Sequence, residues 1–240
     1  MAIAPPDSAL IDKVVIANRI LYDQGVVDGL GHVSVRHDSA PGVFLLSCNR
    51  APGLVKRADI LCYDLDGNTL TPTSERSYLE RFIHAEIYRA RPDVVAVVHS
   101  HSPSVIPFGA TGNRLRPIFH MAGFLGGGSS IFDQRDVAGD TDLLVRNGEL
   151  GKALAQSLGN CSCVLMRGHG STVVGTSIEQ AVYRAIYAEV NAKMQAQALG
   201  MGQVTYLTAK EADLAAAAND TQIGRSWDLW RRRIGPIDAA

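Results

Sequence analysis

The 240-residue sequence predicts a single α/β domain in which a central, mainly antiparallel sheet is flanked by helices. Short runs rich in β-branched residues, such as residues 94–98, have the length and composition of buried strands. Longer segments with apolar side chains at helical spacing accompany them, and helices packed on a sheet bury both kinds of surface. No internal repeat or long linker divides the chain. We therefore expect one domain over residues 1–240, with a C-terminal tail from about residue 204.

The individual elements follow from local patterns. The expected strands are apolar runs bounded by turn-forming residues, at residues 32–36, 43–47, 60–65, 69–70, 94–98 and 163–166 and through Val173 and Val174. The expected helices carry apolar side chains every three or four residues, at residues 8–24 after Asp7 or Ser8 as cap, from near Ser74 or Ser77 to Arg91-Pro92-Asp93, and from about Ser177 to Leu199.

Composition and charge exclude several classes of partner. A formal net charge of −1 gives no long-range attraction to nucleic acid or an anionic membrane. No stretch approaches the roughly 20 apolar residues that span a bilayer, and the start, from Met1 to Pro6, lacks the pattern of a signal peptide. The four cysteines are too few and too irregularly spaced for a disulfide scaffold. We expect a cytoplasmic protein that binds a small molecule.

Three histidines form a candidate metal site. His99 and His101 end the apolar run at residues 94–98, and because side chains alternate along a strand, both imidazoles point to the same side. His169 lies between two glycines, which let the backbone pass close to other groups, and is the best third ligand. Three imidazoles, with or without a carboxylate, suit zinc and other first-row divalent ions. An isolated His-x-His pair also has many structural roles.

A glutamate could join this site. Glu80 and His84 are four residues apart and so are neighbours on one face of the expected helix. The Glu80 carboxylate could complete the metal shell, or it could carry a proton after substrate displaces it. His84 could orient Glu80, or it could be a packing histidine.

These segments resemble the class II aldolase/adducin family over most of the chain. The resemblance is carried by Gly31-His32-Val33-Ser34, Glu80-Arg81-Phe82-Ile83-His84, Ile87-Tyr88, Arg91-Pro92-Asp93 and His99-Ser100-His101, in this order and spacing. In aldolases of the family three histidines bind zinc, and the matching residues are His99, His101 and His169. The family's glutamate, which ligates the metal or moves protons, falls on Glu80. The resemblance implies a three-layer α/β/α fold and a homotetramer with its sites near subunit boundaries.

The sequence departs from the phosphosugar aldolases of that family where they bind phosphate. Those enzymes carry small polar residues in three loops, and the corresponding places here read Gly31-His32, Ser47-Cys48-Asn49-Arg50 and Tyr78-Leu79. Tyrosine and leucine leave little room for a phosphate, whereas the planar guanidinium of Arg50 suits a carboxylate. A phosphosugar substrate is therefore disfavoured. Arg50 and His32 become candidate substrate-binding residues, although either could be structural.

Other segments resemble the decarboxylase branch of the family, which includes 3-hydroxy-2-methylpyridine-4,5-dicarboxylate decarboxylase and dihydroxyphthalate decarboxylases. They are residues 47–55, 99–108 and 120–126. In this comparison His120 lies roughly where the aldolases carry a proton-donating tyrosine, which makes His120 a second candidate for catalytic proton transfer beside Glu80.

The leading hypothesis is a metal-dependent, non-oxidative decarboxylase of a hydroxylated aromatic or heteroaromatic carboxylate. The cofactor would be one divalent ion per chain, with manganese or zinc favoured over cobalt or iron. The alternatives are a class II aldolase acting on a hydroxy-carbonyl or sugar-derived substrate, and a non-catalytic binding module of the adducin type. The same cation would serve decarboxylation and aldol cleavage, because both develop negative charge on the substrate.

Overall fold

The computed structural model describes residues 4–237; residues 1–3, on which part of the signal-peptide expectation rests, lie outside the described residues. Seven strands form one sheet in the order β3-β2-β1-β4-β7-β6-β5. Neighbouring strands are antiparallel except for β5 and β6, which are parallel. The strands are β1 (His32–Arg36), β2 (Val43–Ser47), β3 (Ile60–Asp64), β4 (Ala96–Ser100), β5 (Ser130–Phe132), β6 (Cys163–Met166) and β7 (Gly170–Gly175). The prediction of a mainly antiparallel sheet is confirmed.

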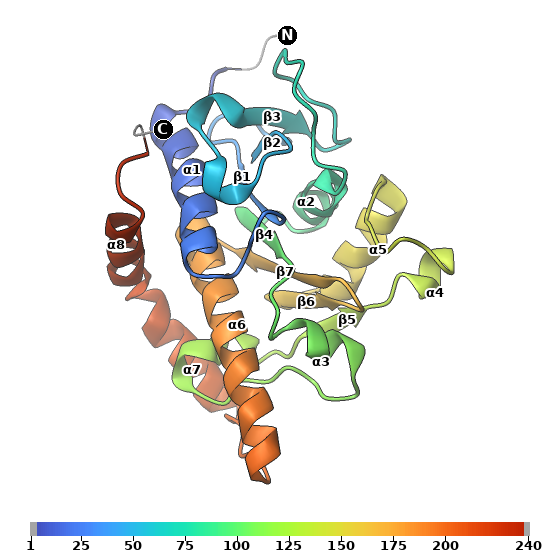
Figure 1. Cartoon of the computed structure of the whole chain (residues 1–240), viewed down its shortest axis with the longest axis vertical. Coiled ribbons are helices and arrows are strands. Elements are labelled where there is room, and N and C mark those ends of the chain that lie inside the picture. Colours follow the sequence, from blue (N-terminus) through green and yellow to red (C-terminus); the bar gives the residue numbers. More distant parts are fainter. Residues whose placement is uncertain (1–3, 238–240) are drawn as a thin grey trace.

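Helices lie on both faces of this sheet, so the fold has three layers (Figure 1). The α-helices are α1 (Ser8–Asp23), α2 (Arg81–Ala90), α3 (Ile106–Ala110), α4 (Arg135–Ala138), α5 (Gly148–Leu158), α6 (Ile178–Met201), α7 (Ala209–Asp220) and α8 (Ile223–Arg233), and the 3₁₀ helices are η1 (Pro52–Leu54), η2 (Arg57–Asp59) and η3 (His120–Leu125). One core lies between the sheet and α1, α6 and α8, and the other between the sheet and α2 and α5.

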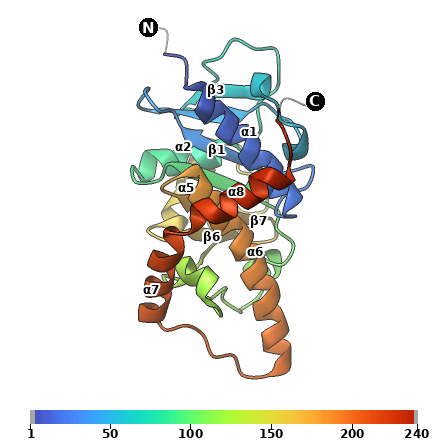
Figure 2. The ribbon, with the colours of Figure 1, turned by 90° about the vertical axis from the view of Figure 1, so that its left-hand side faces the viewer.

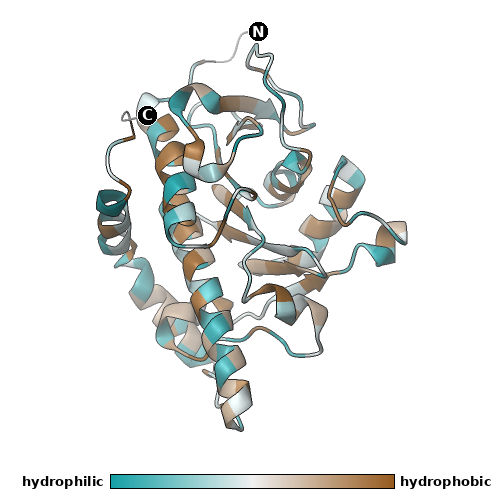
Figure 3. Cartoon of the chain, in the orientation of Figure 1, coloured by the Kyte–Doolittle hydropathy of each residue, from teal (hydrophilic) through white to brown (hydrophobic). Residues whose placement is uncertain are grey.

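Strand alternation divides the apolar residues between the two cores. In β4, Ala96 and Val98 enter the core with α1 and α6, whereas Val97 enters the core with α2 and α5. Because both faces of β4 are covered, the strand is apolar throughout until it reaches His99. Figure 3 shows hydrophobic residues gathered along the strands and on helix surfaces next to them. The first polar side chains of β4 therefore appear where the strand leaves the core.

The segment expected as a C-terminal tail from about residue 204 contains α7 and α8. Trp227 and Trp230 of α8 are buried in the core shared with α1 and α6, and Figure 2 shows α8 lying across these two helices. α7 packs on η3, where Gly123 and Gly126 leave room for its backbone and for Ala212. Both helices are therefore packed parts of the fold. No helix in the described part of the chain is long and apolar enough to cross a membrane.

Local patterns predicted some elements well and others poorly. The first helix, capped by the Asp7 carboxylate, and the strands β1, β2 and β6 are confirmed. The expected second strand at residues 69–70 is wrong, because Thr69 makes only an isolated bridge with Tyr63. The expected strand at residues 94–98 is displaced, since β4 covers Ala96–Ser100 and so includes His99.

The predicted start of the second helix near Ser74 or Ser77 is also wrong. α2 begins at Arg81, and Glu80 is its N-cap, with non-helical backbone angles. The residues before it are held by long-range contacts: the Asn49 amide donates to the Arg76 carbonyl, and the Tyr78 hydroxyl donates to the Arg50 carbonyl. Residues 74–79 therefore stay against β2 and its following loop instead of forming a helical turn.

The packing of α5 on α2 leads to a stability prediction. Gly151 lies where an added Cβ would come 2.5 Å from the Phe82 carbonyl oxygen, whereas nothing lies within 4 Å of a Cβ added at Gly200 in α6. We expect Gly151→Ala to lower the free energy of unfolding by about 1–3 kcal/mol through overpacking. Gly200→Ala, the matched control, should leave stability unchanged or raise it by up to about 1 kcal/mol, since alanine favours helix. Chemical denaturation of both variants is the measurement, and equal stabilities would contradict the packing described here.

Candidate metal centre

Two neighbouring strands and one turn bring three histidines together. His99 is the fourth residue of β4, His101 follows directly after this strand, and His169 lies in the turn between β6 and β7. β4 and β7 pair antiparallel with Ser100 opposite Ser171, so the turn before β7 lies beside the end of β4. A Cβ on Gly170 would collide with the Ser100 carbonyl oxygen. Glycine at this position therefore permits the backbone approach that places His169 beside His101.

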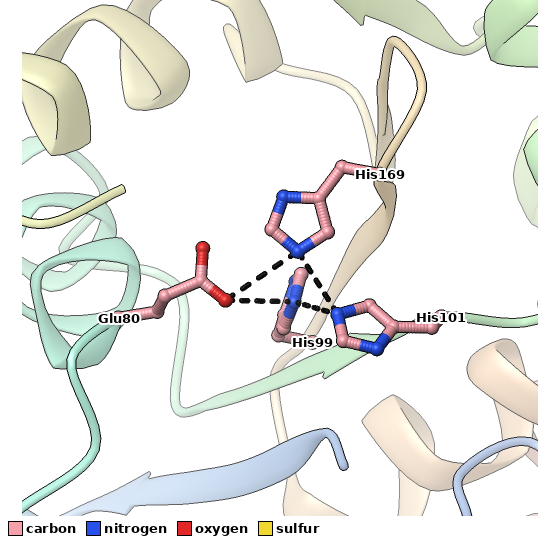
Figure 4. A group of neighbouring side chains, drawn as sticks. All are labelled: Glu80, His99, His101 and His169. Carbon is pink, nitrogen blue, oxygen red and sulfur yellow. Dashed lines mark hydrogen bonds and ion pairs between the residues drawn. The ribbon is translucent and has the colours of Figure 1, made fainter. Parts of the chain in front are cut away.

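The ligand atoms of the three histidines face one another (Figure 4). His101 Nε2 lies 2.9 Å from His169 Nε2 and 3.3 Å from His99 Nε2. Glu80 Oε2 lies 3.5 Å from His99 Nε2 and 3.4 Å from His169 Nε2. A tetrahedral ion with bonds of about 2.0–2.1 Å has ligand–ligand edges of about 3.3–3.4 Å. Four of the six separations, 2.9–3.5 Å, are therefore close to the edges that a tetrahedral divalent cation requires, and all of the ligand atoms lie within 4.8 Å of one another.

The fourth ligand comes from the start of α2. As the N-cap residue of this helix, Glu80 is buried, and its Oε1 accepts a hydrogen bond of 2.9 Å from the Val145 amide. This leaves Oε2 directed at the histidines. Burial alone would raise the pKa of Glu80, but His99, His169 and the Val145 amide together lower it to about 2. Glu80 is therefore ionised at neutral pH, as a metal ligand must be.

A second layer of contacts orients the imidazoles. His169 Nδ1 lies 2.7 Å from the Leu143 carbonyl oxygen, which can only accept, so the ring nitrogen there carries the proton. In a neutral imidazole this leaves the lone pair of Nε2 facing the cluster, an arrangement common around protein-bound metals. Leu143 is also the one non-glycine residue of the described chain with a positive φ, 66°. Backbone strain of this kind occurs often at functional sites.

The protonation states of the histidines also suit metal binding. Burial lowers the pKa of His99 well below its usual value, and burial together with His169 lowers the pKa of His101. The pKa of His169 is raised, because Glu80 and the Leu143 carbonyl outweigh the effect of burial. Two neutral imidazoles, a third oriented by Leu143 and an ionised carboxylate make a donor set suited to a borderline first-row cation.

The cluster opens into a cavity of about 330 Å³, which is large enough for a small ring compound. Its polar lining includes His32, Asn49, Glu80 and His101. Its remaining lining is largely apolar, from Leu30, Tyr78, Leu79 and Leu144 with the backbone of Gly31. The Tyr78 hydroxyl donates to the Arg50 carbonyl, so this side chain presents its ring rather than its hydroxyl to the cavity.

The other sequence-predicted site residues have different positions. His32 is buried, lines the cavity, and its ring centroid lies 5.0 Å from that of His99. Arg50 does not line the cavity, and its Nε lies 2.9 Å from Asp59 Oδ1. His120 lies exposed on η3, next to α7, and its carbonyl accepts from the Asn219 amide. The structure therefore brings His32 to the metal cluster but does not bring Arg50 or His120 there.

Several residues of the site were not predicted. The loop before α5 supplies the Val145 amide, the Leu143 carbonyl and the apolar side chain of Leu144. No pattern in the sequence distinguishes this loop, because two of its three contributions are backbone groups. The bulky ring of Tyr78 was expected near the substrate, but the partner of its hydroxyl was not.

Comparisons with known proteins assign the chain to a family. Residues 12–196 match the family described as Class II Aldolase and Adducin N-terminal domain. The chain belongs to this family. It is 39% identical to the decarboxylase tropJ of Talaromyces stipitatus, with 95% of each chain covered. It is 31% identical to a 3,4-dihydroxyphthalate decarboxylase of Arthrobacter keyseri, with 95% of this chain and 94% of the relative covered.

A solved structure shows the same fold. The aldolase II superfamily protein of Pseudomonas syringae superimposes with a TM-score of 0.81 at 22% identity, covering 97% of this chain and 94% of that one. The resemblance to the class II aldolase/adducin family and its three-layer α/β/α fold is confirmed. The named relatives above are decarboxylases, which are carbon–carbon lyases, so the expected placement in the decarboxylase branch is also confirmed.

The geometry predicts metal content. We expect protein purified without chelators to carry about one divalent ion per chain, and His101→Ala to weaken binding by at least about 100-fold, since loss of an outer contact alone costs 10–100-fold. His120→Ala is the matched control, because it removes an exposed histidine outside the cluster. Elemental analysis and metal titration measure both. Equal metal content in the two variants would remove His101 from the site.

Proposed function

We propose that the protein is a metal-dependent decarboxylase that removes a carboxylate, without oxidation, from a hydroxylated aromatic or heteroaromatic mono- or dicarboxylate. The observation that carries this proposal is the cluster of Glu80, His99, His101 and His169 beside a cavity with largely apolar walls. Its relatives that are named decarboxylases support the reaction type. The cavity supports a ring as the body of the substrate.

His99, His101, His169 and Glu80 would hold one divalent cation, for which manganese or zinc is favoured over cobalt or iron. Bound there, such a cation supplies Lewis-acid stabilisation of negative charge on the substrate. The residues fit it because their ligand atoms all lie within 4.8 Å of one another, with Glu80 and His99 buried. The chain's own groups then bind the ring, orient its substituents and move the proton.

Glu80 is the proton carrier in this proposal. Ionised in the resting protein, Glu80 would give up its place as a ligand when the substrate binds, accept the proton of the substrate's ring hydroxyl and return it to the ring carbon that bears the carboxylate. The bond from that carbon to the carboxylate then breaks, its electron pair stays with the ring, and carbon dioxide leaves. The phenolate product takes up a proton from solvent on release. No oxidant or further reactant is needed.

The cavity walls favour a planar ring over a sugar phosphate. Tyr78 and Leu79 fill the place where phosphosugar aldolases would have small polar groups, and the Tyr78 hydroxyl is already engaged by the Arg50 carbonyl. His32 is proposed to bind a further oxygen of the substrate. Arg50 remains a candidate for a second carboxylate only through its terminal nitrogens, because its Nε faces Asp59.

His120 could donate a proton only if a neighbouring copy of the chain brought it to the cavity. We propose a homotetramer or a higher homo-oligomer, as the family resemblance implies, in the cytoplasm, where the four free cysteines would stay reduced. Within one chain, Glu80 is the group positioned for proton transfer.

Two other functions are compatible with part of this site. An aldolase would need the same cation and the same fold, but the apolar walls offer little to a phosphorylated sugar. A non-catalytic binding module of the adducin type would not need a metal cluster. The four converging ligand atoms favour an enzyme.

The proposed reaction is tested by carbon dioxide release. Hydroxylated benzene- and pyridine-dicarboxylates should release carbon dioxide, and a chelator should stop the release until a divalent cation is restored. Gas-phase or coupled detection of carbon dioxide is the measurement. No release from any of these compounds, together with aldehyde formation from a ketose phosphate, would reverse the proposal in favour of the aldolase.

The role of Glu80 is tested in the same assay. Glu80→Gln keeps the shape of the side chain and the acceptor for the Val145 amide but cannot carry a proton between the two substrate atoms. We expect kcat to fall by about 100-fold or more, the usual range for loss of a general acid or base. Metal content should be measured in parallel, because activity lost only through lost metal would argue against proton transfer by Glu80.

A further inference from the structure

The mouth of the cavity beside the metal cluster carries two exposed leucines, Leu30 and Leu79, which we call the leucine rim. Leu30 is 62% exposed and Leu79 is 54% exposed, and both line the cavity. Two other lining residues are buried: Glu80 belongs to the cluster, and the ring of His32 lies 5.0 Å from that of His99. The cavity therefore runs from a buried polar end at the metal ligands to an exposed apolar rim.

The backbone fixes the position of Leu30 at this rim. The Leu30 amide donates to Asp28 Oδ1 over 2.8 Å, and the next residue, Gly31, has a positive φ of 96°. A Cβ added at Gly31 would lie 2.7 Å from Val27 Cγ1 and 3.1 Å from the His99 carbonyl oxygen. The chain therefore passes close to the end of β4 here, which sets where Leu30 lies relative to the metal ligands.

Leu79 is fixed by both of its neighbours. The carbonyl of Tyr78 accepts a hydrogen bond of 2.9 Å from the Arg81 guanidinium, and Glu80 is buried in the metal cluster. The place of Leu79 is therefore tied to that of a candidate ligand. Single exposed leucines are common on protein surfaces, whereas apolar side chains grouped around one cavity indicate a binding surface.

The cavity has more room than an unsubstituted ring needs. Its volume of about 330 Å³ is roughly twice that of an engineered cavity of about 150 Å³ that binds benzene. Among the described residues that line it, none is lysine or arginine, so a charged group at the rim would have no cationic partner there. Asn49, also exposed at this cavity, offers only a neutral amide. The spare volume therefore suits an uncharged group.

We propose that Leu30 and Leu79 are specificity-determining residues that select a substrate whose ring carries a short alkyl group on the edge opposite its metal-binding oxygens. This inference rests on the proposed function and specifies its substrate class. With the ring hydroxyl and the departing carboxylate at the metal cluster, the far edge of the planar ring points to the leucine rim. An alkyl group there removes apolar surface of both leucines from water, which favours binding.

The inference is tested with two ligands that cannot be decarboxylated. Catechol presents two neighbouring ring oxygens but has no carboxylate, and 4-propylcatechol adds an alkyl group on the opposite edge. With zinc-loaded protein and calorimetry, we expect the wild type to bind 4-propylcatechol about tenfold more tightly than catechol. Each fully buried methylene contributes about fourfold, and burial at an open rim is partial.

Substitution of the rim should remove this preference. Leu30→Ser and Leu79→Ser should each lower the ratio of the two affinities about threefold, and the double variant should bind both ligands within about twofold of each other. Catechol serves as the internal reference, because damage to the metal cluster would weaken both ligands and leave their ratio unchanged.

Leu54→Ser is the matched control. Leu54 is 65% exposed on the 3₁₀ helix η1 and does not line the cavity, so this variant should keep the wild-type ratio. Equal binding of the two ligands by the wild type, an unchanged ratio in the double variant, or no binding of either ligand would overturn the inference. Equal binding is also the result expected if a second copy of the chain covers the rim. Absence of carbon dioxide release from hydroxylated ring carboxylates would instead overturn the proposed function and leave the measured ratio intact.

Discussion

The structure of the site depends on one close backbone contact, between Gly170 at the start of β7 and the Ser100 carbonyl at the end of β4. This contact brings the turn that carries His169 beside the strand that carries His99. Any side chain at position 170 would separate the two segments. The convergence of three Nε2 atoms is therefore a property of backbone packing, and the imidazoles need little freedom of their own to reach a common point.

Burial then determines the solvation and charge of these residues. The same apolar cores that cover both faces of β4 also remove water from His99 and Glu80. A carboxylate kept ionised among neutral imidazoles is unfavourable unless it gains hydrogen bonds and positive charge, and the Val145 amide provides one such hydrogen bond. A divalent cation would complete the balance. The fold thus places a buried cluster of metal-ligating side-chain types beside a cavity with largely apolar walls.

The sequence predicted the parts of the site that local rules control. The alternation of side chains along a strand predicted that His99 and His101 point to the same side of the sheet, and the glycines around His169 indicated a close backbone approach. Long-range contacts decided the rest. The Asp59 carboxylate, nine residues from Arg50 along the chain, holds its Nε outside the cavity, and the packing of η3 on α7 leaves His120 exposed. α2 begins only at Arg81, after its N-cap Glu80, because the Tyr78 hydroxyl is bonded to the loop after β2.

The four-residue spacing of Glu80 and His84 allowed two interpretations, which the structure distinguishes. Glu80 and His84 were expected as neighbours on one helix face, with His84 either orienting Glu80 or packing as a structural histidine. In the structure Glu80 faces the candidate metal cluster, whereas His84 lies within hydrogen-bonding distance of Ser34 and His32. The helix α2 therefore links the two sets of polar groups through its backbone rather than through a direct hydrogen bond.

The most direct test of this account is a crystal structure of the zinc- or manganese-loaded protein with data collected at the absorption edge of the metal. The account predicts one anomalous peak within about 2.0–2.3 Å of the Nε2 atoms of His99, His101 and His169, with Glu80 beside it. A peak elsewhere, or a fully loaded crystal in which His169 does not contact the metal, would contradict it.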